Sequence, residues 1–158
     1  MFVTNHVLSG VVIGRLLERR PISAFFVGLA SHLVLDAVPH WGCALTAEAD
    51  RHRFHRYAQR DGLLGLAAAF GVVVAVDGRS RPATLAAIAG TVLLDADKPM
   101  VHFLRRNAFP RVVRRIHARV QRESRQGMPI EVAFGLSFAL ADAAIAVHGR
   151  RRHPRVAA

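Results

Sequence analysis

The 158-residue chain has a single cysteine, Cys43, and a single lysine, Lys98, among its 22 basic residues. One cysteine excludes an intrachain disulfide and a thiolate zinc site, so a bound metal needs histidine, aspartate or glutamate ligands. The sequence also lacks a GxSxG nucleophile elbow, a P-loop and a Rossmann glycine pattern. These absences remove the common signatures of serine hydrolases, of NTP-binding proteins and of dinucleotide-binding proteins.

Long uncharged runs are also missing. The apolar run from Gly62 to Val76 stops after 15 residues, whereas a spanning helix needs about 20. Hydrophobic residues nevertheless make up 52% of the chain, and the mean hydropathy is +0.25. Arginines lie at both ends of the expected helices, so the positive-inside rule gives no simple topology. We therefore predict short, tilted or half-inserted helices on an anionic membrane, with a soluble bundle as the alternative.

The formal net charge of +11 indicates a polyanionic partner. An anionic lipid surface or a small anionic substrate fits this charge best, and nucleic acid is a less favoured alternative. Another explanation requires no partner. Arginine in place of lysine, together with many alanines and valines, is typical of a GC-rich bacterial genome, and this coding bias alone raises the charge.

Five apolar segments, each bounded by charge or by proline and glycine, are long enough for helices. A sixth, basic segment has apolar residues and His117 on one face and arginines on the other, which predicts an amphipathic helix. The predicted fold is all-α, a compact bundle of five to six helices, several of them short and membrane-associated or membrane-embedded. Residues 1–148 form one domain, and residues 149–158 form a basic, disordered tail. The expected helices cover Thr4–Leu17, Ile22–Val38, Gly62–Val76, Ala83–Leu94, Pro110–Arg125 and Met128–His148.

The segment SHLVLDAVPHW carries the first candidate ligands. His32 and Asp36 are four residues apart, so a helix places them on one face about one turn apart. The following proline ends that helix and leaves His40 at its edge, able to bend back toward the same point. In an antiparallel hairpin that turns near residue 20, His6 comes level with the space between His32 and Asp36.

The second hairpin, which turns near residue 80, brings acidic groups to the same end of the bundle. Asp61 comes level with residue 99, close to Asp95 and Asp97. His117 on the basic helix and Glu131 at the start of the last helix are candidates to close over that end. Burying several ionisable groups is costly unless they pair or ligate a cation, which favours a metal site. The candidate ligands are His6, His32, Asp36, His40, Asp61, Asp95 and His117.

These residues also have structural interpretations that require no metal. His32 could cap the carbonyls at the end of its helix, and Asp61 could be the N-cap of the third helix. Asp95 could pair with Arg105 or Arg106. Under these roles the chain is a helical bundle with buried ion pairs.

Mixed histidine and carboxylate ligands suit a divalent metal, zinc first, with manganese or iron as alternatives. Such an ion lowers the pKa of bound water and produces a hydroxide able to attack a phosphoester. In this interpretation Asp97 and Glu131 are the catalytic carboxylates that orient or deprotonate the water. Arg105 and Arg106 then bind the anionic group of the substrate.

Three motifs resemble a family of uncharacterised bacterial membrane-bound metal-dependent hydrolases, more distantly similar to zinc-dependent phospholipase C. The motifs are NHVLSGVVIG, SHLVLDAVPHW and GTVLLDADKP, and the resemblance spans residues 4–99. The chain has Leu94 where the family commonly has proline, and it lacks the family's Arg-Gly-x-Thr-His-Ser element. The resemblance implies that the metal ligands are His6, His32, Asp36, Asp95 and Asp97.

The leading hypothesis is a metal-dependent hydrolase in the bacterial cytoplasmic membrane that acts on a phosphoester or a similar anionic substrate. The alternative is a non-catalytic membrane protein that binds anionic lipid or nucleic acid through its arginine-rich helix and tail.

Overall fold

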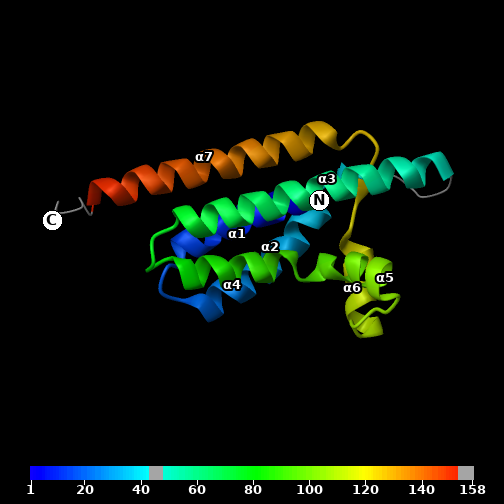
Figure 1. Cartoon of the computed structure of the whole chain (residues 1–158), viewed down its shortest axis with the longest axis horizontal. Helices are drawn as coiled ribbons and strands as arrows, with labels where there is room; N and C mark the ends of the chain where they lie inside the picture. Colours follow the sequence, from blue (N-terminus) through cyan, green and yellow to red (C-terminus); the bar gives the residue numbers. More distant parts are fainter. Residues whose placement is uncertain (43–47, 153–158) are drawn as a thin grey trace.

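The computed structural model describes residues 1–42 and 48–152 (Figure 1). These residues form seven α-helices, a short 3-10 turn (η1, Leu94–Ala96) and two parallel two-residue strands (β1, His40–Trp41; β2, Glu123–Ser124). The predicted all-α bundle is confirmed. The helices are α1 (Val3–Leu16), α2 (Pro21–Ala37), α3 (Glu48–Ala75), α4 (Arg81–Val92), α5 (Asp97–Leu104), α6 (Arg111–Val120) and α7 (Met128–Arg152).

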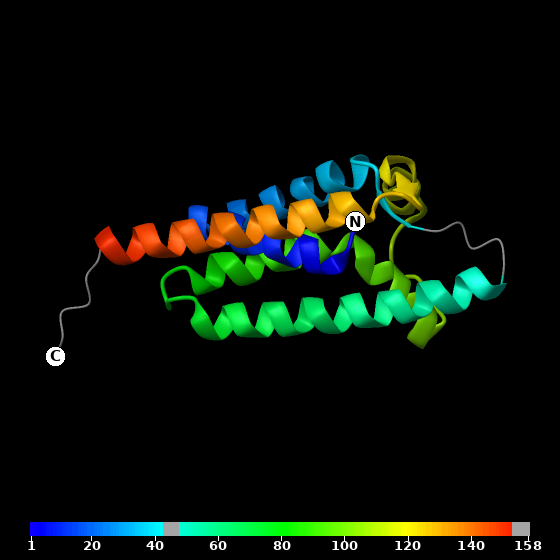
Figure 2. The same ribbon diagram turned by 90° about the horizontal axis from the view of Figure 1, so that it is seen from above.

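Helix α1 lies at the centre of the bundle and packs against α2, α3, α4 and α7. The α1–α2 and α3–α4 turns lie at one end, and α5 and α6 lie beyond the opposite end, as both views show (Figures 1 and 2). Prolines at the first turns of α2 and α4 favour these helix starts, because a first-turn residue needs no backbone N–H partner.

Glycines allow α1, α2 and α4 to approach one another closely. A Cβ added at Gly90 of α4 would come within 2.2 Å of the Phe25 carbonyl oxygen of α2. Small side chains fill the space between these helices, with Ala24, Ala83 and Ala87 fully buried. Such contacts between small residues hold helices together where apolar surroundings give no hydrophobic driving force.

The outer helices present apolar side chains to the surroundings. Two segments, His55–Ala75 of α3 and Met128–Gly149 of α7, are long and apolar enough to cross a membrane, and in the apolar 18-residue stretch of each only 6% is buried within the protein. An ion pair between Arg15 of α1 and Asp142 joins α7 to the central helix. The large exposed apolar residues on these two segments are Tyr57, Leu63, Leu64, Leu66, Phe70, Val74, Val132, Leu136, Leu140 and Val147.

Three helices differ in length from the sequence prediction, and α5 was not predicted. α6 ends at Val120 instead of Arg125, and Glu123 and Ser124 instead form the strand that pairs with β1. α3 begins at Glu48 instead of Gly62 because the residues between them contain no proline or glycine and continue the helix. α7 continues to Arg152, past the predicted start of the tail. Residues 153–158 of the tail, and Cys43, lie outside the described residues.

Candidate metal centre

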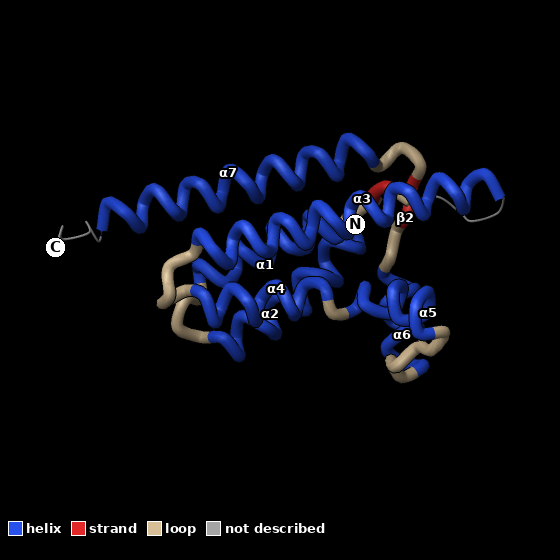
Figure 3. Tube along the Cα trace, in the orientation of Figure 1, coloured by secondary structure: helices blue, strands red, loops and turns tan. Residues whose placement is uncertain are grey.

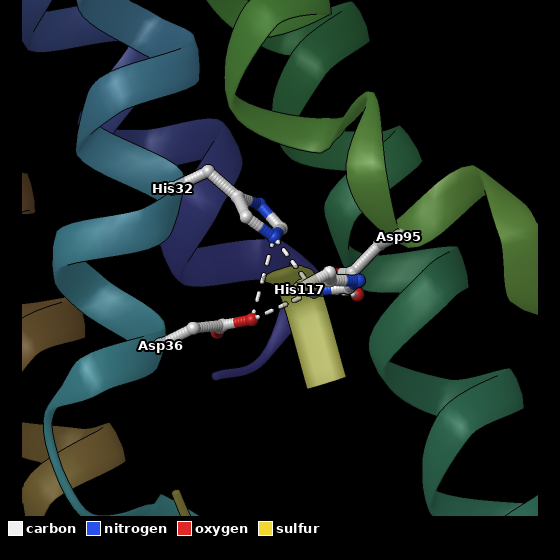
Figure 4. A group of neighbouring side chains, drawn as sticks. All are labelled: His32, Asp36, Asp95 and His117. Atoms are coloured by element: carbon white, nitrogen blue, oxygen red, sulfur yellow. Dashed lines mark hydrogen bonds and ion pairs between the residues drawn. The ribbon is translucent and has the colours of Figure 1, made fainter. Parts of the chain in front are cut away.

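Four buried side chains converge at the α5–α6 end of the bundle: His32 and Asp36 from α2, Asp95 from η1 and His117 from α6 (Figure 4). One ligand atom from each lies within 4.8 Å of the others. His32 Nε2 is 3.3 Å from Asp36 Oδ2 and 3.1 Å from His117 Nε2. His117 Nε2 is 3.1 Å from the same Asp36 oxygen.

His6 of α1 lies directly beside this group. Its Nε2 is 3.2 Å from Asp36 Oδ1 and 3.8 Å from Asp95 Oδ2. Its ring stacks on that of His32, with the centroids 4.2 Å apart and the planes at 20°. The predicted meeting of His6, His32 and Asp36 through an antiparallel hairpin is confirmed.

A backbone contact fixes the orientation of His32. The Nδ1–H group of His32 donates a 2.6 Å hydrogen bond to the carbonyl oxygen of Thr91 near the end of α4. This bond leaves Nε2 facing Asp36, with its lone pair available once it loses its proton. Metal-binding histidines are commonly held in this way, by a hydrogen bond from the other ring nitrogen to a carbonyl or carboxylate.

The 3-10 turn η1 directs Asp95 into the bundle. α4 ends at Val92, and the tighter turn that follows places the Asp95 carboxylate at the bundle end. Asp95 Oδ1 accepts a 2.8 Å hydrogen bond from Lys98 Nζ. Asp95 Oδ2 is buried and accepts no hydrogen bond from the described residues. Asp97 opens α5, and its Oδ1 is likewise buried without a hydrogen-bond donor there.

The parallel β1–β2 pairing, drawn in red in Figure 3, lies just after α6 and helps to bring His117 to the centre. The backbone N–H of Arg122 donates to the Asp36 carbonyl at 3.0 Å, and the N–H of His40 donates to the Arg122 carbonyl at 3.0 Å. These bonds tie the residues after α6 to the residues after α2. They place the His117 ring over Asp36, a direction that the sequence prediction left undetermined.

Hydrogen bonds and nearby positive groups lower the pKa of both carboxylates. Burial raises the pKa of Asp36, but hydrogen bonds from His117 and two further imidazoles outweigh burial and hold the pKa well below its usual range. Burial also raises the pKa of Asp95, but the Lys98 ammonium and nearby imidazoles outweigh it and lower the pKa to about 2. Both groups are therefore ionised at neutral pH, which is the form that ligates a metal.

Two predicted site residues bind the start of α1 instead of joining the four-residue group. Asp61 accepts hydrogen bonds from the backbone N–H groups of Val3 at 2.6 Å and Thr4 at 3.1 Å. Glu131 accepts from the N–H of Phe2 with both oxygens. These carboxylates satisfy donors that a helix N-terminus leaves unpaired, and they complement its dipole. The N-cap role proposed for Asp61 thus applies to α1 and not to the third helix.

The remaining predicted residues lie outside the four-residue group. His40 is buried, and its Nδ1 contacts the Val38 carbonyl at 2.9 Å. Arg105 and Arg106 are exposed at the end of α5, where Arg105 adopts a left-handed backbone with φ 54°. Within the described residues, Asp95 pairs with Lys98 and with neither of these arginines.

The sequence interpretation missed two positively charged contacts of the centre. One is Lys98, three residues after Asp95 and therefore on the same helical face, a spacing that could have revealed it. The other is the amino group of Met1, which donates to Asp36 Oδ1 at 2.6 Å.

Comparison with protein-family models, with curated proteins and with solved structures found no match to this chain. The family resemblance of the three motifs therefore stays a prediction.

Proposed function

We propose that this protein is a membrane-associated, metal-dependent hydrolase that acts on a phosphoester or a similar anionic substrate. The observation that supports it is the buried group of two imidazoles and two carboxylates whose ligand atoms lie within 4.8 Å of one another. Burying so many ionisable groups in a small apolar bundle is costly without a cation to compensate them. Two nitrogen and two oxygen donors suit zinc, with manganese and iron as alternatives.

The proposed chemistry divides among the residues around the centre. A bound divalent ion supplies Lewis acidity and an activated water. We assign Asp97 to orient or deprotonate that water, because its buried Oδ1 accepts no hydrogen bond from the described residues. Glu131 is less suited to this role because both of its oxygens accept a hydrogen bond from Phe2. The exposed Arg105 and Arg106 bind the anionic group of the substrate.

Metal analysis of the full chain purified in detergent tests this proposal. We expect zinc, manganese or iron to copurify with the wild type and to be lost from His32→Ala and Asp36→Ala. His40→Ala, which removes another buried histidine, is the matched control and retains the metal. Hydrolysis of bis-p-nitrophenyl phosphate follows the metal content. Equal, negligible metal in the wild type and all variants contradicts the proposal.

We place the protein in the bacterial cytoplasmic membrane. Support comes from the two apolar segments in α3 and α7, which bury little of their surface within the protein. Expression in a bacterium, followed by an alkaline carbonate wash of the membranes, provides the test. The protein stays with the pellet if these helices are inserted, and release into the wash contradicts the assignment.

A second candidate function rests on the exposed side chains of α6. Arg111, Arg114, Arg115 and Arg119 are exposed on this helix beside the exposed Val112 and Ile116. A basic and apolar surface of this kind fits an anionic membrane. In this case salt-sensitive binding to phosphatidylglycerol vesicles survives His32→Ala and is lost when the arginines are replaced by glutamine. If the protein still binds the vesicles after that replacement, the non-catalytic lipid-binding function is rejected.

A further inference from the structure

Each of the two carboxylates, Asp36 and Asp95, uses one oxygen to face His117 and the other to face His6. Asp36 Oδ2 lies 3.3 Å from His32 Nε2 and 3.1 Å from His117 Nε2. The other oxygen, Asp36 Oδ1, lies 3.2 Å from His6 Nε2. Asp95 repeats this division, because its Oδ1 is 4.0 Å from His117 Nε2 and its Oδ2 is 3.8 Å from His6 Nε2.

The set that contains His6 has an uncompensated acceptor. Asp95 is 5% exposed, yet its Oδ2 accepts no hydrogen bond from the described residues. A buried carboxylate oxygen is costly unless a donor or a cation faces it. His6 Nε2 is the ring atom that approaches this oxygen, and the same atom approaches Asp36 Oδ1. His6 Nε2 thus faces one oxygen of each carboxylate.

We infer that the centre holds two divalent transition-metal ions bridged by Asp36 and Asp95. The first ion binds His32, His117, Asp36 Oδ2 and Asp95 Oδ1, and this part rests on the proposed function. The second ion binds His6, Asp36 Oδ1 and Asp95 Oδ2. It has one nitrogen and two oxygen ligands from the protein, which leaves positions for water or for a substrate oxygen.

Positive groups contact both carboxylates that the inference places between the ions. The Met1 ammonium lies 2.6 Å from Asp36 Oδ1, and Lys98 Nζ lies 2.8 Å from Asp95 Oδ1. An ion in the second position takes the place of the Met1 charge on Asp36. Each of the two carboxylates thus carries a positive group on its Oδ1 atom, whereas Asp95 Oδ2, on the His6 side, has none.

The substrate class follows from this arrangement. Two ions about 3.5–4 Å apart stabilise the attacking and the leaving oxygens of a phosphoryl group at the same time. A phosphoester would suit such a pair of ions, because its hydrolysis develops charge on an attacking water oxygen and on a leaving ester oxygen.

Manganese loading of the full chain in detergent tests the second position. We expect about two Mn²⁺ per wild-type chain by native mass spectrometry, with the exchange-coupled electron paramagnetic resonance signal of two adjacent ions. His6→Gln lowers the content to about one ion per chain and abolishes the coupling. His40→Gln, at a buried histidine outside both sets, keeps two coupled ions.

The outcomes separate this inference from the proposed function. One uncoupled ion per wild-type chain, with phosphodiesterase activity retained, overturns the second position and leaves the proposed function standing. Two coupled ions in His6→Gln also overturn it. Absence of any metal from the wild type overturns both. The coupling in the wild type is measured without substitution, so a folding defect in a variant does not decide the result.

Discussion

Gly14 of α1 and Thr84 of α4 lie so close that a Cβ added at Gly14 would come within 2.2 Å of the Thr84 Cα. The contact is between backbones, so no side-chain rotation relieves it. It sets the distance between the helix that carries His6 and the helix that leads into Asp95. The packing of small residues thus determines the separation of two halves of the candidate centre.

Replacing Gly14 with alanine should destabilise the protein by roughly 1–3 kcal/mol, because the added methyl group forces α1 and α4 apart. Thermal unfolding in detergent measures this effect. Gly71→Ala is the matched control, since a Cβ at Gly71 of α3 meets nothing within 4 Å. The control should be neutral or stabilising by up to about 1 kcal/mol, given alanine's higher helix propensity. Equal stability of the two variants would mean that α1 and α4 do not pack as described.

Metal binding should strengthen as the pH rises. Burial lowers the pKa of His32, but the hydrogen bond to Asp36 and the charge of Asp95 outweigh burial and raise the pKa above 6.5. In the metal-free protein this raised pKa stabilises the fold below about pH 6.5, and that contribution is lost as the pH rises through the folded-state value. A metal ion binds only neutral His32, so the stability that a bound metal adds to the fold increases over the same pH range.

The melting temperatures of metal-loaded and EDTA-treated protein, measured between about pH 6 and pH 8, test this expectation. The difference between the two forms should widen toward the higher pH. A difference that is constant or that narrows toward pH 8 contradicts the assignment of His32 as a ligand.

Substituting Asp61 with asparagine should weaken the fold without removing the metal. The two carboxylate oxygens accept hydrogen bonds from the N–H groups of Val3 and Thr4. Asparagine replaces one of these acceptors with an amide donor, so one N–H group loses its partner at a cost of about 1–3 kcal/mol. Asp36→Asn, by contrast, should abolish metal binding. Thermal unfolding together with metal content distinguishes the two effects, and metal loss in Asp61→Asn would make Asp61 part of the centre.

Replacing Lys98 with methionine should raise metal affinity about two- to fivefold. The ammonium lies 2.8 Å from Asp95 Oδ1 and competes with a cation for that oxygen. The side chain is 45% exposed, so solvent screening keeps the effect modest. Competition with a fluorescent zinc chelator measures the dissociation constant. Arg79→Met, in the turn at the other end of the bundle, is the control and should leave the affinity unchanged.

The sequence predicted the part of the centre that depends on helical periodicity. Spacing placed His32 and Asp36 on one face, and the short α1–α2 turn brought His6 to their height. Both follow from local rules, because an antiparallel hairpin relates sequence distance to height. The predicted bounds of α1 and α2 were accordingly close to the observed ones.

Features that depend on long-range contacts could not be predicted in the same way. The parallel β1–β2 pairing that positions His117 consists of two residues in each strand and has no sequence signature of its own. The roles of Asp61 and Glu131 at α1 follow from the packing of α3 and α7 on α1, which no local pattern encodes. Asp95 was predicted at the correct end, but its inward direction depends on the 3-10 turn.

The tie between the residues after α2 and those after α6 also has a consequence for biosynthesis. A growing chain can assemble the His6, His32 and Asp36 contacts as soon as its first hairpin folds. His117 is translated much later, and its imidazole reaches Asp36 only when β2 pairs with β1. Because domains generally fold as the ribosome releases them from the N-terminus onward, we expect the candidate centre to be completed late in maturation, after the first five helices have been made.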